Sequence, residues 1–195
     1  AIAHIAGRLD ESEAHYARGA ESLRGSGALD AVGITTLAFL TLRMTQGRAA
    51  EFTDALTSVD TQAPDVIADL FAIPLLAAGR RAEAIEFRRG IRPVRRDFFH
   101  GLLLTMRGII VAALADPVEA AGVYADLLAY RGQLGGGGSG SYAVGPVDTV
   151  LGDLARVLGD REAARQFYRA GADLAAACGN RYWVDEATRR ARALD

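Results

Sequence analysis

Apolar residues recur at helical spacing along most of the chain, and most clearly in residues 147–178. Two amphipathic stripes with steps of three and four residues are separated there by a short break around Gly159. The small residues Ala164 and Gly171 predict a close approach of the two helices, with Tyr168 filling the space between them. A helical hairpin of this kind leaves an apolar seam uncovered and needs similar neighbours.

A second copy of this pattern stands at the start of the chain. The order glycine, small residue, aromatic residue, small residue has the same offsets in both copies, namely Gly7, Ser12, Tyr16, Gly19 and Gly159, Ala164, Tyr168, Gly171. Further turns are expected at Gly47, Gly79 and Ala115, where alanine takes the place of glycine. The irregular spacing of 32 to 44 residues between successive turns fits repeats built from helix pairs.

The pattern therefore predicts an all-α fold, a right-handed solenoid of about eleven helices in one domain over residues 1–195. No segment alternates apolar and polar residues with a period of two, so no strand is expected. Residues 48–59 are predicted as the second helix of the first full hairpin. Because the chain begins at Ala1 inside a helical pattern, we expect it to be a fragment of a longer protein. The predicted units are a half repeat at 1–24, hairpins at about 28–60, 64–90, 97–131 and 146–178, and a capping helix at 182–194.

Composition narrows the possible environments and partners. The formal net charge of −2 argues against direct binding of nucleic acid, although all 22 basic residues are arginine. A single cysteine, Cys178, excludes an internal disulfide and fits a reducing cytoplasm. The most apolar run, 101–115, is too short to span a bilayer and contains Arg107. We expect a cytoplasmic protein without a membrane segment.

The glycine-rich segment contains a nucleotide-binding pattern only in the literal sense. Gly135, Gly137 and Gly140 satisfy G-x-G-x-x-G, but that fingerprint requires a strand before it and a helix start at its third glycine. A flexible loop is the favoured interpretation. The absence of lysine from the chain also excludes a phosphate-binding loop that depends on lysine.

No set of residues in the sequence assembles a catalytic or metal site. His4 and His15 flank several acids, but they lie on opposite sides of the turn at Gly7 and lack the spacing of a ligand pair. His100 has no nucleophile near it, and Cys178 has no basic partner. We therefore expect no enzyme activity, no catalytic residues, no metal and no cofactor.

The hairpin at 147–178 resembles the tetratricopeptide repeat. Leu151 and Gly152 match the Leu-Gly of its first helix, and the glycine, small and aromatic positions listed above match its second helix. Residues 95–195 contain, in order, Arg-Arg-Asp-Phe-Phe at 95–99, a long helix, the segment 115–132, a glycine loop, Gly-Pro-Val-Asp-Thr-Val-Leu-Gly-Asp-Leu-Ala at 145–155 and Gly-Asn-Arg-Tyr-Trp at 179–183. This order is similar to the tetratricopeptide-like C-terminal region of large bacterial LuxR-type ATPase regulators. The resemblance implies a sensing or interaction arm of a transcriptional regulator.

The resemblance also implies a concave groove lined by the first helix of each repeat. The groove positions carried over by spacing are weakly polar: Thr41, Asp69, Thr105, Thr149, Asp153 and Arg156. They lack the lysine and asparagine with which some tetratricopeptide proteins clamp a peptide carboxylate. Arg107 stands where the repeat has leucine, so we expect a salt bridge between helices or a rotated helix, since a buried and unpaired arginine would be very costly.

Arginine is concentrated between residues 80 and 96, where seven arginines face two glutamates. One interpretation is a surface that binds a phosphate, an acidic peptide or an acidic protein surface; the other is an exposed helix face with partial pairing to the glutamates. The candidate partner-binding residues are Arg88, Arg89, Arg92, Arg95 and Arg96. For Trp183 we expect packing of the last helix rather than an anchor for a partner.

Two functions remain open at this point. The first is a non-catalytic protein-interaction and sensing domain of a bacterial transcriptional regulator, bound to a protein partner or to other domains of its parent. The alternative is a receptor that binds a small molecule or peptide in the helical groove. A truncated first repeat would expose apolar surface at the Ala1 end, so a homodimer is also expected.

Overall fold

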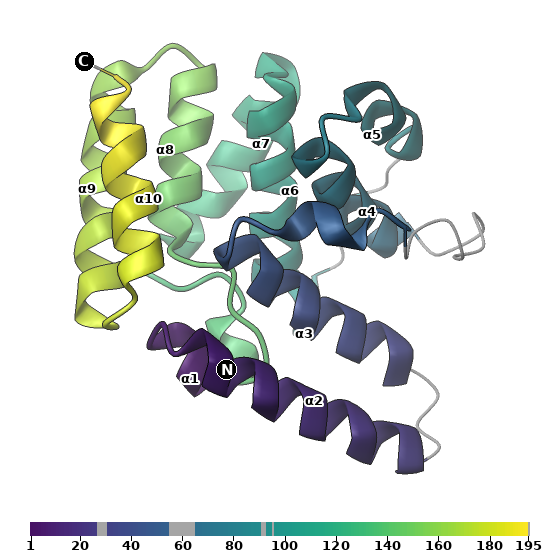
Figure 1. The fold of residues 1–195 in the computed structure, drawn as a ribbon. Coiled ribbons are helices and arrows are strands. Elements are labelled where there is room, and N and C mark those ends of the chain that lie inside the picture. The colour runs from purple at the N-terminus through teal and green to yellow at the C-terminus, as the bar shows by residue number, and fades with distance from the viewer. Residues whose placement is uncertain (27–30, 55–64, 91–92, 95, 195) are drawn as a thin grey trace.

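The computed structural model describes residues 1–26, 31–54, 65–90, 93–94 and 96–194, apart from the side chains of residues 31–32 and 65–69. These residues form ten α-helices and no β-strand (Figure 1). The helices are α1 (Ile2–Ile5), α2 (Leu9–Ser26), α3 (Ala31–Thr45), α4 (Asp65–Ala77), α5 (Arg81–Phe87), α6 (His100–Leu114), α7 (Pro117–Leu127), α8 (Val147–Val157), α9 (Arg161–Ala177) and α10 (Arg181–Arg192). Short 3₁₀-helices are η1 (Ala49–Phe52), η3 (Leu128–Tyr130) and η4 (Gly137–Ser139). The all-α prediction is confirmed for this part of the chain.

All five predicted turn positions have left-handed backbone conformation. Their φ angles are 70° at Gly7, 71° at Gly47, 75° at Gly79, 50° at Ala115 and 83° at Gly159. Ala115 is the one residue other than glycine with positive φ in the described ranges. At the glycine turns, as at Gly159, the turn N–H donates to the carbonyl three residues before it, and the next N–H donates to the carbonyl five residues back. This Schellman-type arrangement satisfies the last carbonyls of each preceding helix.

The helix count is ten among the described residues, rather than about eleven. The difference lies in residues 48–59, predicted as one helix, of which the structure describes the 3₁₀-helix η1 and Thr53–Asp54. The Thr53 hydroxyl donates to the Ala50 carbonyl, a local bond of the kind that competes with regular helix. Residues 55–60 of this predicted hairpin lie outside the described residues.

Helix α6 occupies the centre of the molecule, which accounts for the apolar run in the sequence. Leu102, Met106 and Ile110 belong to a core cluster shared with α3 and α4. Leu104 and Val111 belong to a second cluster shared with α7 and α8. A helix that is apolar on nearly all sides is therefore buried among other helices. No helix within the described ranges is long and apolar enough to cross a membrane.

The C-terminal hairpin packs as the sequence pattern predicts. A Cβ atom added at Gly152 of α8 would lie 2.5 Å from Cδ1 of Tyr168 on α9. A Cβ atom added at Gly171 would lie 2.4 Å from the Thr149 hydroxyl oxygen. Ala164 and Tyr168 are buried between the helices. Small residues thus permit the close approach of α8 and α9, with Tyr168 filling the seam.

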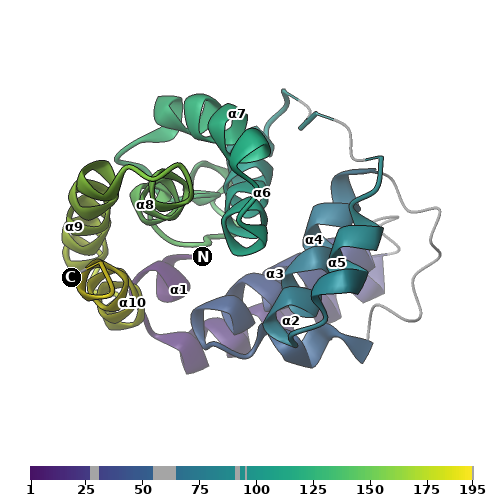
Figure 2. The same cartoon turned by 90° about the horizontal axis from the view of Figure 1, so that it is seen from above.

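The row of helices curves so that the first and last helices meet (Figure 2). The Asn180 amide nitrogen, at the start of α10, donates to the His4 carbonyl of α1 at 2.9 Å. Ala3 and His4 are buried, although Ile2 is 80% exposed. The expected apolar surface at the Ala1 end is therefore exposed at Ile2, whereas Ala3 and His4 are buried and Asn180 at the α9–α10 turn contacts His4. This contact between α1 and α10 differs from an open stack of repeats, in which each repeat contacts only its sequence neighbours.

The glycine-rich segment, residues 132–145, has no regular structure apart from η4, and part of it packs against the helices while residues 132–133, 138 and 140–141 are exposed. The Gly135 N–H donates to the Gly145 carbonyl, and the Val144 N–H donates back to Gly135, both at 2.9 Å. Tyr142 and Ala143 are buried. The segment is thus a loop, as expected, and backbone hydrogen bonds and two buried side chains hold it against α6.

Candidate functional site

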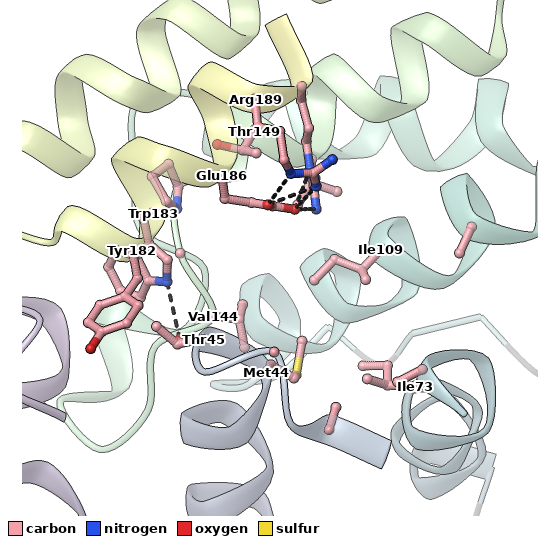
Figure 3. A pocket seen from close by; sticks show the side chains of 18 of the residues that line it. Met44, Thr45, Ile73, Ile109, Val144, Thr149, Tyr182, Trp183, Glu186 and Arg189 are labelled. Atoms are coloured by element: carbon pink, nitrogen blue, oxygen red, sulfur yellow. Dashed lines mark hydrogen bonds and ion pairs between the residues drawn. The ribbon is translucent and has the colours of Figure 1, made fainter. Parts of the chain in front are cut away.

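A cleft of about 580 Å³ lies between the two halves of the curved row of helices (Figure 3). Residues from α3, η1, α4, α6, α8, α10 and the glycine-rich segment line it. Its apolar side is formed by Met44, Leu76, Val150 and, as Figure 3 shows, by Ile73, Ile109 and Val144. Helices that belong to different parts of the sequence thus contribute to one apolar wall.

All charged residues that line the cleft come from α10. They are Asp185, Glu186, Arg189 and Arg190, spaced so that they follow one side of the helix. Glu186 accepts hydrogen bonds from both arginines, at 2.7 Å from Arg189 Nη2 and 2.9 Å from Arg190 Nε. The cleft therefore has an apolar side and, on α10, a charged side.

A hydrogen-bonded group closes the end of the cleft beside α1. Trp183 Nε1 donates to the Thr45 hydroxyl at 3.2 Å, and His4 Nε2 hydrogen-bonds with the same oxygen at 2.8 Å. The Thr45 hydroxyl donates to the Thr41 carbonyl at 3.3 Å, so it accepts from Trp183 and His4. Both Thr45 and Trp183 line the cleft. The predicted packing role of Trp183 is confirmed, and the packing joins α10 to α3 and α1.

Burial keeps His4 uncharged at neutral pH. Its side chain is fully buried beside the Trp183 ring, with 5.6 Å between the ring centroids. His4 Nδ1 has no hydrogen-bond partner among the described residues. A proton added at Nδ1 would therefore be buried without an acceptor. Burial accordingly lowers the pKa of His4 to about 4.

Asp153 fastens the charged helix to its neighbours. The buried Asp153 carboxylate on α8 accepts from the Tyr168 hydroxyl of α9 at 2.8 Å and from Arg190 Nη1 of α10. Burial raises the pKa of Asp153, against the attraction of Arg190. This bridge holds α10 in place, so the charged side of the cleft has a rigid support.

The residues predicted from the resemblance to line a groove are not brought together. Thr41 and Thr105 are fully buried and donate to carbonyls of their own helices, so neither can contact a partner. Thr149 lines the cleft, but its hydroxyl lies against Gly171. Arg156 is exposed on α8, away from the cleft lining, and Asp153 is paired as described above. The Asp69 side chain lies outside the described residues.

The predicted arginine surface is also divided. The buried Arg88 side chain donates to both oxygens of Glu119 on α7, at 3.1 and 2.7 Å. Arg89, just beyond the end of α5, is exposed and pairs with Glu86 of that helix at 3.0 Å. Arg96 is exposed, while Arg92 and Arg95 lie outside the described residues. For Arg88 and Arg89, pairing within the protein is the interpretation that the structure favours.

Arg107 is buried on α6 but is not without an interaction partner. A buried arginine without a partner would have contradicted the predicted helical packing. Arg107 does not have that arrangement. In the described ranges, no group of three or more His, Cys, Asp or Glu residues is placed to hold a metal ion.

The prediction of site residues missed the charged side of the cleft. Glu186, Arg189 and Arg190 stand at steps of three and four, which the sequence shows, but this spacing is typical of any solvated helix face. What distinguishes them is the neighbouring apolar wall, built from residues 36 to 146 positions away in the sequence.

No known family model, characterised protein or solved structure shows a significant match to this chain.

Proposed function

We propose that this chain is a non-catalytic binding domain whose ligand occupies the cleft between α3, α4, α6, α8 and α10. The observation that carries the proposal is the amphipathic lining, with apolar side chains on most sides and charged side chains on α10 alone. The volume of about 580 Å³ lies within the range of sites for small ligands. An amphipathic small molecule, or the side chains of a short amphipathic peptide, would match this lining.

The cleft supports this receptor function better than a docking surface made by the arginines. Arg88 is held by Glu119, and neither Arg88 nor Arg89 lines the cleft. Exchanging an intramolecular partner of Arg88 for a protein partner would break a partly buried pair. We further infer that the helix pairs are degenerate tetratricopeptide repeats and that ligand binding serves sensing in a bacterial regulator. The left-handed turns and the segment order given above support that inference.

A neutral fluorescent probe tests the proposed site. N-phenylnaphthylamine, which becomes fluorescent in apolar surroundings, is titrated into the protein. We expect saturable binding that Ala113→Trp abolishes, because Ala113 lines the cleft and a bulky ring there fills it. The matched control is Ala82→Trp on α5, another exposed helical alanine that does not line the cleft.

The same titration can also contradict the proposed site. Probe binding that Ala113→Trp leaves unchanged, or that Ala82→Trp reduces equally, would contradict a site in this cleft. Circular dichroism and thermal unfolding of both variants verify that each is folded. A bound ligand also raises the melting temperature with its concentration, which gives a second measure of occupancy.

A further inference from the structure

The hydrogen-bonding capacity of the α10 side of the cleft is unevenly used. Each guanidinium nitrogen of Arg190 has a partner, since its Nη1 donates to Asp153 and its Nε and Nη2 lie within 2.9 Å of Glu186 Oε1. Glu186 receives both arginines, with contacts from Arg189 to each of its oxygens at 2.7 to 3.1 Å. A carboxylate offers about four lone-pair sites. Glu186 therefore has no acceptor site left for a cationic ligand.

Arg189 retains unused donors. Its Nε and Nη2 bind Glu186, whereas its Nη1 has no partner among the described residues. Its side chain is 67% exposed, and Figure 3 shows it beside Glu186 at the cleft. Nη1 of Arg189 can therefore donate to a ligand while Nε and Nη2 remain on Glu186.

The remaining acid of the lining does not offset this. Asp185 is 70% exposed, and its carboxylate lies 3.6 Å from Arg181 on the same helix. Like Glu186, Asp185 thus already has an arginine beside it, and that arginine, Arg181, does not line the cleft. The unused group of the charged side is therefore a planar guanidinium donor, whose geometry fits a carboxylate with two parallel hydrogen bonds.

We propose that the ligand of the cleft is an amphipathic carboxylate, whose acid group binds Arg189 while its apolar body lies against Met44, Ile73 and Ile109. This inference rests on the proposed function, because it assigns the chemical class of the molecule that fills the same cleft. The apolar wall supplies affinity for the body of the ligand, and Arg189 determines the selectivity among head groups.

Three probes with the same apolar chain and different head groups test the assignment. Decanoate, decanol and decylamine are compared, below their micelle concentrations at neutral pH, as competitors of N-phenylnaphthylamine in the full chain. We expect decanoate to bind about tenfold tighter than decanol, the size of a charge-assisted hydrogen bond. Decylamine, which is cationic, is expected to bind no tighter than decanol.

Substitution of the arginine separates its role from that of the apolar wall. Arg189→Gln is expected to weaken decanoate by about tenfold and to leave decanol unchanged. The matched control is Arg181→Gln, an exposed arginine of the same helix that does not line the cleft, and it should change neither affinity.

The outcomes distinguish failure of this inference from failure of the proposed function. If the neutral fluorophore and decanol bind but decanoate has no advantage, or if Arg189→Gln weakens all three probes equally, the head-group assignment is overturned and the cleft remains a binding site. A preference for decylamine overturns it as well. If the fluorophore itself does not bind, both proposals fall.

Discussion

The first and last copies of the repeated pattern are Gly7–Gly19 and Gly159–Gly171. Their structures agree at the turn glycine and the first small residue and differ at the two later positions. Both turn glycines are left-handed, with φ angles of 70° and 83°. Both first small residues are buried, Ser12 at 1% and Ala164 at 0% exposure. The turn and the small residue after it therefore follow from local spacing in either context.

The two copies diverge at the aromatic residue and at the second small residue. Tyr168 is buried and donates to Asp153, whereas Tyr16 is half-buried and donates to the Ser141 carbonyl at 3.1 Å. Gly171 lies against Thr149, but a Cβ atom at Gly19 would meet nothing within 4 Å. The difference arises because α9 packs along the eleven-residue α8, while α2 follows the four-residue α1. A pattern of small and aromatic residues thus makes a tight seam only where a preceding helix of similar length lies beside it.

Truncation of the two tyrosines gives the largest expected contrast. Tyr168→Ala should lower the free energy of unfolding by about 4 kcal/mol, because it opens a cavity beside Gly152 and removes a donor from the buried Asp153. Tyr16→Ala should cost roughly half as much, since its ring is only partly buried. Urea denaturation followed by circular dichroism measures both. Equal losses would show that the two seams are alike after all.

Lowering the pH should destabilise the protein through the first copy of the pattern, at the residue three positions before Gly7. His4 is buried there, whereas the corresponding Arg156 of the last copy is exposed. Because burial lowers the pKa of His4 from 6.5 to about 4, the unfolded chain takes up the proton first as pH falls. The stability that neutral His4 confers is complete above pH 6.5 and should decline by about 3 kcal/mol down to pH 4.

Urea unfolding at neutral and acid pH measures this loss. His4→Gln should remove most of the pH dependence between these limits, because glutamine does not titrate. His15→Gln is the control, since His15 is an exposed histidine of the next helix. A pH dependence that His4→Gln leaves unchanged would mean that other groups cause it.

Alanine at the second small position should have opposite effects in the two copies. Gly171→Ala is expected to destabilise the protein by about 2 kcal/mol, because its Cβ would meet the Thr149 hydroxyl and backbone. Gly19→Ala, in open space within a helix, should stabilise by about 0.5–1 kcal/mol. Thermal and urea unfolding of the pair are sufficient, and the same sign for both substitutions would refute the contrast.

The last expected effect concerns the feature that the copies share, the left-handed turn. Ala115 has φ 50° and ψ 41°, a conformation that costs alanine more than glycine. Ala115→Gly should raise the free energy of unfolding by about 1 kcal/mol. Gly159→Ala, the reverse change at a matching turn, should lower it by a similar amount. A destabilising Ala115→Gly would show that the alanine methyl group contributes packing that outweighs the backbone strain.

Local spacing was sufficient for several elements of this molecule. The turns at Gly7, Gly47, Gly79, Ala115 and Gly159 follow from short stretches, because a helix end needs only its own last carbonyls and one left-handed residue. The close seam between α8 and α9 was also predictable, since its two helices are joined by one short turn. The predicted helix at 48–59 shows the limit, because apolar spacing does not register the local hydrogen bonds of residues such as Thr53.

The site depended on contacts that local spacing does not contain. Trp183 and Thr45 meet across 138 positions, and Asn180 and the His4 carbonyl across 176. These contacts bring α10 opposite α3, α4 and α6, and so convert an ordinary charged helix face into one side of a cleft. Thr41 and Thr105, which the resemblance placed in a groove, are buried, and Thr105 lies against Gly135 of the glycine-rich segment. Periodicity specifies which face of each helix is apolar, whereas the angles at which successive pairs pack accumulate along the chain and determine which faces finally meet.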